Sequence, residues 1–146
     1  MIVAFAYLVL IACNIWILMN KTEPEKLRII RERYSMLREY IVADNKDPRF
    51  NILRHPIILT AYDKKGGDLG YNTNKGYEIG FCIDGEPNEI FHVLFHELAH
   101  STVSDYGHGE EFWKNFRDLK DMCTKIGLYE MIPEKTEFCG KYIQDV

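Results

Sequence analysis

The sequence predicts an α+β fold, in which a short antiparallel sheet packs on helices and one N-terminal transmembrane helix precedes them. Three observations lead to this class. The chain begins with an apolar segment, continues with apolar residues at helical spacing, and then alternates apolar and polar residues as strands do. Its 146 residues suffice for one domain with an appendage. We expect a transmembrane anchor over residues 1–20, an amphipathic connecting helix over 21–46 and the folded domain over 47–146.

The apolar N-terminal segment runs from Ile2 to Met19. A helix of this length rises about 27 Å, close to the hydrocarbon thickness of about 30 Å. A cleaved signal peptide would need a charged start and small residues before the cleavage site, and the segment shows neither clearly. Leu10-Ile11-Ala12-Cys13 resembles a lipoprotein box, but the residues after Cys13 stay apolar. We therefore expect a single membrane anchor through residues 2–19.

Basic residues follow this apolar segment closely, whereas few positive groups precede it. They are Lys21, Lys26, Arg28, Arg31 and Arg33. Lys and Arg beside a membrane span tend to stay on the cytoplasmic side. The charge pattern thus predicts that the rest of the chain lies in the cytoplasm.

The segment after the anchor is expected to be an amphipathic helix that ends near Val42. Thr22-Glu23-Pro24-Glu25 predicts a capping box at its start. Apolar residues then recur at alternating steps of three and four, which places them on one face of a helix. They are Leu27, Ile30, Tyr34, Leu37 and Ile41. A break is expected from Asp44 to Pro48.

Three strands are expected in the middle of the chain. The β-branched residues between Pro56 and Tyr62 predict the first. Leu69–Thr73 and Tyr77–Ile83 predict a hairpin around Asn74-Lys75-Gly76. The second arm of this hairpin alternates apolar with other residues, so we expect it to bury one face.

Charge and cysteine content narrow the classes of function. The formal net charge of −4 argues against direct binding to nucleic acid. The cysteines, which form no Cys-x-x-Cys pair, are Cys13, Cys82, Cys123 and Cys139. Because Cys13 lies in the apolar segment, three remain for the folded part. An odd number without framework spacing favours free thiols in a reducing compartment, although one disulfide stays open.

The segment with the clearest chemistry is His96-Glu97-Leu98-Ala99-His100, on a helix expected to begin at the N-cap Asn88. Residues four apart share one face of a helix, so His96 and His100 can bind the same metal ion. This is the His-Glu-x-x-His pattern of zinc hydrolases. Zinc lowers the pKa of a water that it binds from about 15.7 toward about 7. Glu97 can then act as the general base.

A third zinc ligand is expected in His108, which Gly107 and Gly109 flank. Glu110 and Glu111 are alternative ligands if His108 points away. A further helix is predicted from Glu110 to Ile126, ending at Gly127 and packing on the metal helix so that it holds His108. Its apolar stripe consists of Phe112, Phe116, Leu119, Cys123 and Ile126.

Three other residues near the motif are further candidates for a role at the metal site. His92 lies one turn before His96, and three histidines in line on a helix cannot reach one ion, so we interpret it as a packing or supporting residue. Tyr106 is a candidate for stabilising an oxyanion, although most such tyrosines only pack. Asp105 is a candidate for orienting a ligand histidine. No residue pattern around His55 indicates a functional role for it.

The pattern from His96 to His100, followed by His108-Gly109-Glu110-Glu111-Phe112-Trp113, resembles the SprT-like and WLM families of metallopeptidases. The likeness covers roughly Leu59 to Gly127. It implies a small zincin-like domain in which His96, His100 and His108 bind zinc and Glu97 is the catalytic acid/base. It also implies that an extended substrate pairs with a strand edge beside the metal helix, for which the predicted hairpin is the candidate.

We therefore expect a zinc metalloendopeptidase that acts on protein or peptide substrates. Some members of the resembled families cleave proteins crosslinked to DNA, but this chain lacks their accessory DNA- and ubiquitin-binding segments. A compact anchored unit of this type also resembles proteins of large DNA viruses, which would place it in a virion membrane. The alternative is a non-enzymatic, membrane-anchored structural or interaction protein that retains the domain.

Overall fold

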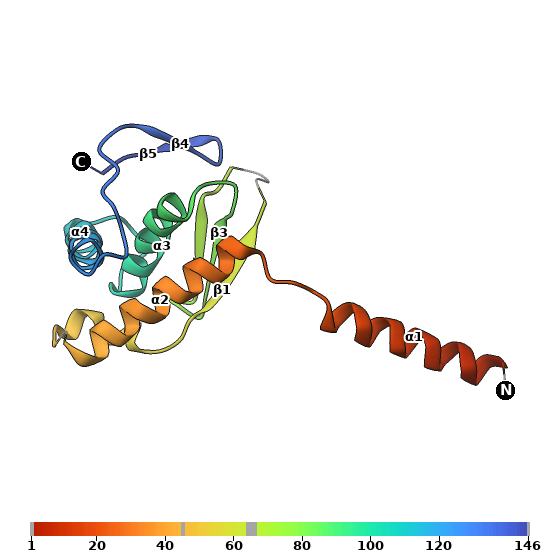
Figure 1. Ribbon diagram of the computed structural model, residues 1–146. Helices are drawn as coiled ribbons and strands as arrows, with labels where there is room; N and C mark the ends of the chain where they lie inside the picture. Colours follow the sequence, from red (N-terminus) through yellow and green to blue (C-terminus); the bar gives the residue numbers. More distant parts are fainter. Residues whose placement is uncertain (1, 45, 64–66, 146) are drawn as a thin grey trace.

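Helices pack against a small sheet, and a short hairpin lies near the C-terminus (Figure 1). The computed structural model describes residues 2–44, 46–63 and 67–145. The helices are α1 (Ile2–Met19), α2 (Glu25–Ala43), the 3-10 helix η1 (Pro48–Arg54), α3 (Pro87–Ser101) and α4 (Glu110–Lys125). The strands are β1 (Ile58–Tyr62), β2 (Gly70–Thr73), β3 (Glu78–Cys82), β4 (Thr136–Phe138) and β5 (Lys141–Ile143). The α+β class is confirmed.

The larger sheet has the order β1–β3–β2, so β3 lies in its centre. The β2–β3 hairpin is confirmed, with Asn72 opposite Ile79. The prediction of a purely antiparallel sheet is wrong, because β1 pairs with β3 in parallel. β3 also buries both faces rather than one. Because β1 pairs with β3 on the edge opposite β2, β3 is hydrogen-bonded along both edges and β2 is left at the edge of the sheet.

Helix α2 buries all five residues of its predicted apolar stripe in the same hydrophobic cluster as α3, β3 and α4. The predicted capping box at Thr22 is wrong. The helix begins at Glu25 behind Pro24, which makes no side-chain cap, and Glu23 instead forms an ion pair of 2.6 Å with Arg31. The helix thus owes its stability to the core that it covers.

Helix α3 begins two residues earlier than expected, with Pro87 as its first helical residue. Its N-cap is Glu86, which forms a reciprocal capping box with Glu89, so the assignment of Asn88 as N-cap is wrong. Proline is favoured at the first helical position because it needs no hydrogen-bond acceptor there. Asn88 instead bonds the backbone of Glu130 through both its amide atoms, which ties α3 to the chain after α4.

Helix α4 and the glycine stop that follows it are confirmed. The helix spans Glu110–Lys125, and Gly127 adopts a left-handed conformation with φ of 76°. Four of the five predicted stripe residues are buried, while Ile126 is partly exposed. Helix α4 packs against α3 (Figure 1), and the buried stripe residues belong to the same hydrophobic cluster as residues of α3, as expected.

The C-terminal tail folds into a hairpin, β4–β5, that the sequence pattern did not indicate. Its turn carries Cys139, which forms a disulfide with Cys82 at the end of β3. The expectation of free thiols is therefore wrong for these two residues, while Cys123 is free and buried. The partners lie 57 residues apart, so no local spacing could reveal the bond. Disulfides are more frequent in oxidising compartments than in the reducing one predicted, so this bond does not add support to that prediction.

Asp145, just after β5, is the centre of a buried polar cluster. Its carboxylate accepts hydrogen bonds from Lys120 (2.6 Å), from the Tyr129 hydroxyl and from the Ile132 backbone N–H (2.8 Å). His92 Nδ1 lies 3.1 Å from the same carboxylate. Burial raises the pKa of Asp145, but the hydrogen bonds outweigh burial and hold the pKa below its ordinary value. The cluster joins the chain end to α3 and α4.

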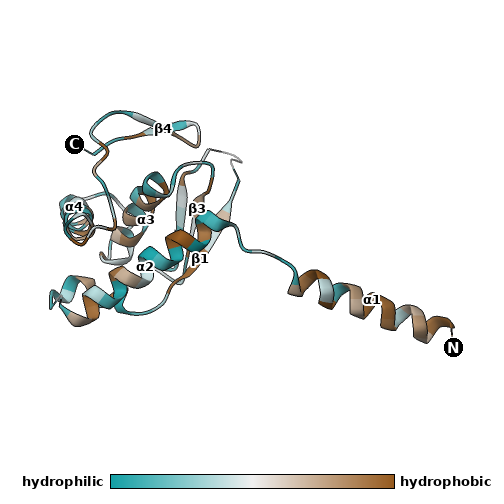
Figure 2. Ribbon diagram, viewed as in Figure 1, coloured by the Kyte–Doolittle hydropathy of each residue, from teal (hydrophilic) through white to brown (hydrophobic). Residues whose placement is uncertain are grey.

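Helix α1 is fully exposed, and its surface is apolar along most of its length (Figure 2). It is the one helix among the described residues that is long and apolar enough to cross a membrane. A membrane anchor and an N-terminal signal sequence both have this character.

We predict that Asp145→Ala lowers the free energy of unfolding by about 3–5 kcal/mol, because it leaves the buried Lys120 ammonium without a partner. Because the folded-state pKa of Asp145 lies below that of the unfolded chain, this stabilisation is present above about pH 4 and is lost as the pH falls through the folded-state value. Urea unfolding of the full chain in detergent measures both effects. Asp121→Ala, at an exposed position on α4, should change the stability by less than about 0.5 kcal/mol. Equal losses in the two variants would contradict the role of Asp145.

Candidate metal centre

Three imidazole rings meet at the end of α3 that is closest to α4. His96 and His100 lie on one face of α3, as their spacing predicts. His108 comes from the loop before α4. The ring centroids are 5.0, 4.9 and 4.7 Å apart for the pairs His96–His100, His96–His108 and His100–His108. One nitrogen from each ring lies within 4.8 Å of the others. Among the described residues, this is the one cluster of its kind.

The spacing of the ring nitrogens suits a tetrahedral zinc site. Nε2 of His96 and Nε2 of His108 are 3.0 Å apart. Two imidazole ligands of a tetrahedral zinc ion, each at about 2.0–2.1 Å, would lie about 3.3 Å apart. Three nitrogen ligands with an open fourth position are the donor set of catalytic zinc sites. The residues present therefore fit the metal that the motif predicts.

The protein environment keeps the two helix imidazoles unprotonated at neutral pH. Burial, together with the neighbouring His100, His108 and His92, lowers the pKa of His96 to about 4. Burial, His108 and the Lys75 ammonium lower the pKa of His100. An unprotonated imidazole has a free lone pair to donate, so both rings are ready to bind a cation.

The Phe112 ring packs against all three histidine rings. The centroid of its ring lies 5.0 Å from His96, 4.5 Å from His100 and 4.6 Å from His108, and it is 1% exposed. Trp113 adds a contact of 5.7 Å to His108. Helix α4 thus positions the third histidine, as the sequence predicts.

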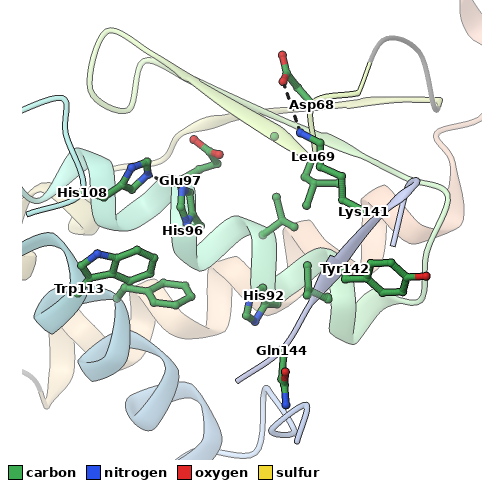
Figure 3. A pocket seen from close by; sticks show the side chains of 14 residues that line it. Asp68, Leu69, His92, His96, Glu97, His108, Trp113, Lys141, Tyr142 and Gln144 are labelled. Carbon is green, nitrogen blue, oxygen red and sulfur yellow. Dashed lines mark hydrogen bonds and ion pairs between the residues drawn. The ribbon is translucent and has the colours of Figure 1, made fainter. Parts of the chain in front are cut away.

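Glu97, on α3, lies close to His96 and His108 (Figure 3), and it lines one cavity together with Gly70 and Asn72 of β2. Its side chain is 7% exposed, and burial together with Asp68 raises its pKa to about 7. A side chain at Gly70 would collide with this arrangement, because a Cβ there would lie 3.1 Å from Glu97 Oε1 and 2.8 Å from Val93. The glycine in β2 therefore leaves room for the carboxyl group.

Lys75, in the β2–β3 turn, holds the loop that carries His108 in place through hydrogen bonds. Lys75 donates to the carbonyl oxygens of His100, Val103 and Asp105 at 2.5 to 3.3 Å, and its ammonium lies 4.1 Å from the centre of the Tyr106 ring. The three carbonyls use all three N–H donors of the lysine. A cation at this end of α3 is also favoured by the helix dipole.

Asn72, on β2, adds a second tie from the hairpin to α3. It donates to the Glu97 carbonyl oxygen and to Ser101 Oγ at 2.6 and 2.7 Å, and it accepts from Gly76 N–H. The sequence pattern placed Lys75 in the hairpin turn and indicated no contact with α3 for Asn72 or Lys75. A polar residue in a hairpin is usually exposed to solvent, so no local pattern distinguishes these two.

The other candidate residues occupy different environments. His92 is 8% exposed and contacts Tyr129 and Asp145, so the interpretation as a packing residue is confirmed. The Asp105 carboxylate accepts from Gly107 N–H, which shapes the loop. Tyr106 is 79% exposed and lines a cavity of about 290 Å³ together with the triad. Its role as an oxyanion donor stays a prediction. Glu110 and Glu111 are exposed at the start of α4 and lie outside the cluster.

Two viral proteins are similar to the chain in sequence. An uncharacterized protein of Invertebrate iridescent virus 6 is 32% identical over 81 residues, which cover 56% of this chain and 38% of that protein. An uncharacterized protein of Acanthamoeba polyphaga mimivirus is 29% identical over 145 residues, covering 86% of this chain and 74% of that protein. The chain thus spans well under half of the first relative. No family model matches the sequence, and no solved structure matches it.

We predict that Lys75→Met weakens zinc binding about 10- to 100-fold, the usual cost of losing a residue that positions a metal ligand. Without the ammonium, three carbonyl oxygens lose their donor and the loop before His108 is freed. Chelator competition on the full chain in detergent measures the affinity. Lys125→Met, at an exposed position on α4, is the matched control and should bind zinc as the unaltered chain does. Equal affinities in both variants would show that Lys75 does not position the site.

Proposed function

We propose that the protein is a membrane-anchored zinc metallopeptidase of the SprT-like and WLM type. One observation carries the proposal: three imidazole nitrogens converge on one point, and the Glu97 carboxyl group lines the same cavity. Structural zinc sites are closed by four protein ligands, whereas catalytic sites have three and an open position. The cluster of three histidines favours the catalytic kind.

The proposed reaction is hydrolysis of a peptide bond. Zinc held by His96, His100 and His108 would polarise the scissile carbonyl and activate the attacking water. Glu97 would take the proton of that water and deliver it to the leaving amine. Burial of the Glu97 carboxyl group favours the uptake of a proton, which suits a group that accepts a proton and then passes it on.

The free edge of β2 supports an extended polypeptide as the substrate. Among the described strands, β2 pairs only with β3, and its Gly70 and Asn72 line the cavity of the triad. Backbone groups on such an edge can pair with the main chain of a peptide. A peptide bound there would run past the histidine cluster.

We predict that Glu97→Gln binds zinc stoichiometrically but lowers peptide cleavage about 100-fold or more, because an amide cannot accept the proton. Metal analysis and cleavage of an unfolded protein by the full chain in detergent measure the two properties. Glu134→Gln, an exposed position in the tail, is the matched control and should retain activity. Cleavage by the Glu97 variant at the normal rate would exclude the mechanism. Stoichiometric zinc without any cleavage by the unaltered chain would instead favour a membrane-anchored structural protein.

We propose further that residues 2–19 anchor the protein and that its domain faces the cytoplasmic side, as the basic residues after the span predict. Both relatives are proteins of viruses, which supports a viral origin and a membrane of the virion as one location. The disulfide is compatible with this side because Cys82 and Cys139 are 0% and 8% exposed. Thiol exchange requires access to a sulfur atom, so burial protects the bond from cellular thiols.

We predict that the full chain stays with membranes during an alkaline carbonate wash, because an apolar span is not held by charge. Deletion of residues 2–19 should release the protein into the soluble fraction. Immunoblots of the membrane and soluble fractions measure this: the full chain should appear in the membrane fraction and the truncated chain in the soluble fraction. A mature protein whose N-terminal sequence starts after Met19 would show that the segment is a cleaved signal instead.

A further inference from the structure

A second and larger cavity opens from the histidine cluster toward the C-terminal hairpin. It has a volume of about 530 Å³ and lies between α3 and β5 (Figure 3). His96, Glu97 and His108 line its inner end. Its size is within the range of about 300–1,000 Å³ that is usual for ligand pockets. A group entering it would thus lie next to the reacting centre.

The walls of this cavity are mainly apolar and come from four separate parts of the chain. The apolar residues are Leu69, Val93, Trp113, Phe116, Tyr142 and Ile143. Two of the polar residues that also line it are already engaged: His92 contacts Asp145, and Gln144 donates to the Pro133 carbonyl. Burial outweighs the nearby Asp145 and lowers the pKa of His92, so this imidazole carries no charge at neutral pH. Such a lining suits a large apolar group.

The hairpin that forms the outer wall is fixed at three points rather than hinged. The Cys82–Cys139 disulfide ties its turn to β3, and the Asp145 cluster ties its end to α3 and α4. Phe138 is 1% exposed and packs over Gly85, where a Cβ would lie 2.2 Å from the ring. The β5 wall is therefore a permanent part of the cavity and is not a lid.

We propose that this cavity is a specificity pocket that binds a bulky apolar or aromatic side chain of the substrate, adjacent to the scissile bond, with β5 as its selective wall. The inference rests on the proposed function. The Asp68–Lys141 pair at the rim lies at 4.0 Å and is exposed, so it frames the opening without closing it. Acidic side chains would have to lose their hydration in the apolar interior, so the pocket disfavours them.

The test uses peptides that differ only in the residues flanking one cleavable bond. The full chain in detergent should cleave substrates with Phe or Leu at one flanking position about 10- to 200-fold faster, in kcat/KM, than those with Ala or Asp there. Ile143→Ala, which shortens the buried side chain of the β5 wall, should reduce this preference. Ile132→Ala removes an isoleucine of similar burial that lines neither cavity, and it should leave the preference intact. Cleavage that depends on Glu97 but shows no apolar preference would overturn the pocket and leave the proposed function standing.

A second measurement does not depend on turnover. Benzyl-bearing and methyl-bearing hydroxamates should both bind the zinc-loaded chain, the benzyl compound at least about 10-fold more tightly. Ile143→Ala should narrow this difference, and Ile132→Ala should not. Equal affinities of the two compounds would refute the pocket even if the protein proves to have no peptidase activity.

Discussion

The packing of Phe112 beneath three imidazole rings is the constraint on which the rest of the site depends. A helix alone can align His96 with His100, but it cannot supply the third ring. Phe112 and the loop before it bring His108 within 3.0 Å of His96. Because Phe112 is buried between α3 and α4, the same contact that builds the core also completes the histidine cluster.

The elements around the histidine cluster each help to shape it. The β2–β3 hairpin leaves room for Glu97 at Gly70 and holds the His108 loop through Lys75. The C-terminal hairpin closes the far side of the larger cavity. The second half of the chain thus surrounds one small site, and its tail is fastened there by both a disulfide and a buried ionic cluster.

The buried cluster around Asp145 shows how the chain couples its stability to its site. Ionic groups removed from water must be paired and hydrogen-bonded, or they destabilise the fold. Here Lys120 and Tyr129 supply those partners, and His92 joins them from the metal helix one turn before His96. The position of the chain end is therefore linked to the orientation of α3.

The sequence by itself determined the α-helices, the β2–β3 hairpin and the alignment of His96 with His100, since these depend on residues a few positions apart. Its motif also named His108, which the packing of Phe112 brings to the other two rings. Steps of three and four identified the buried face of α2, and a step of four aligned His96 with His100. Only the tertiary structure decided the parallel pairing of β1 with β3, the Cys82–Cys139 bond and the roles of Lys75 and Asp145. Each of these joins residues distant along the chain, and burial by the surrounding elements, rather than local periodicity, selects them.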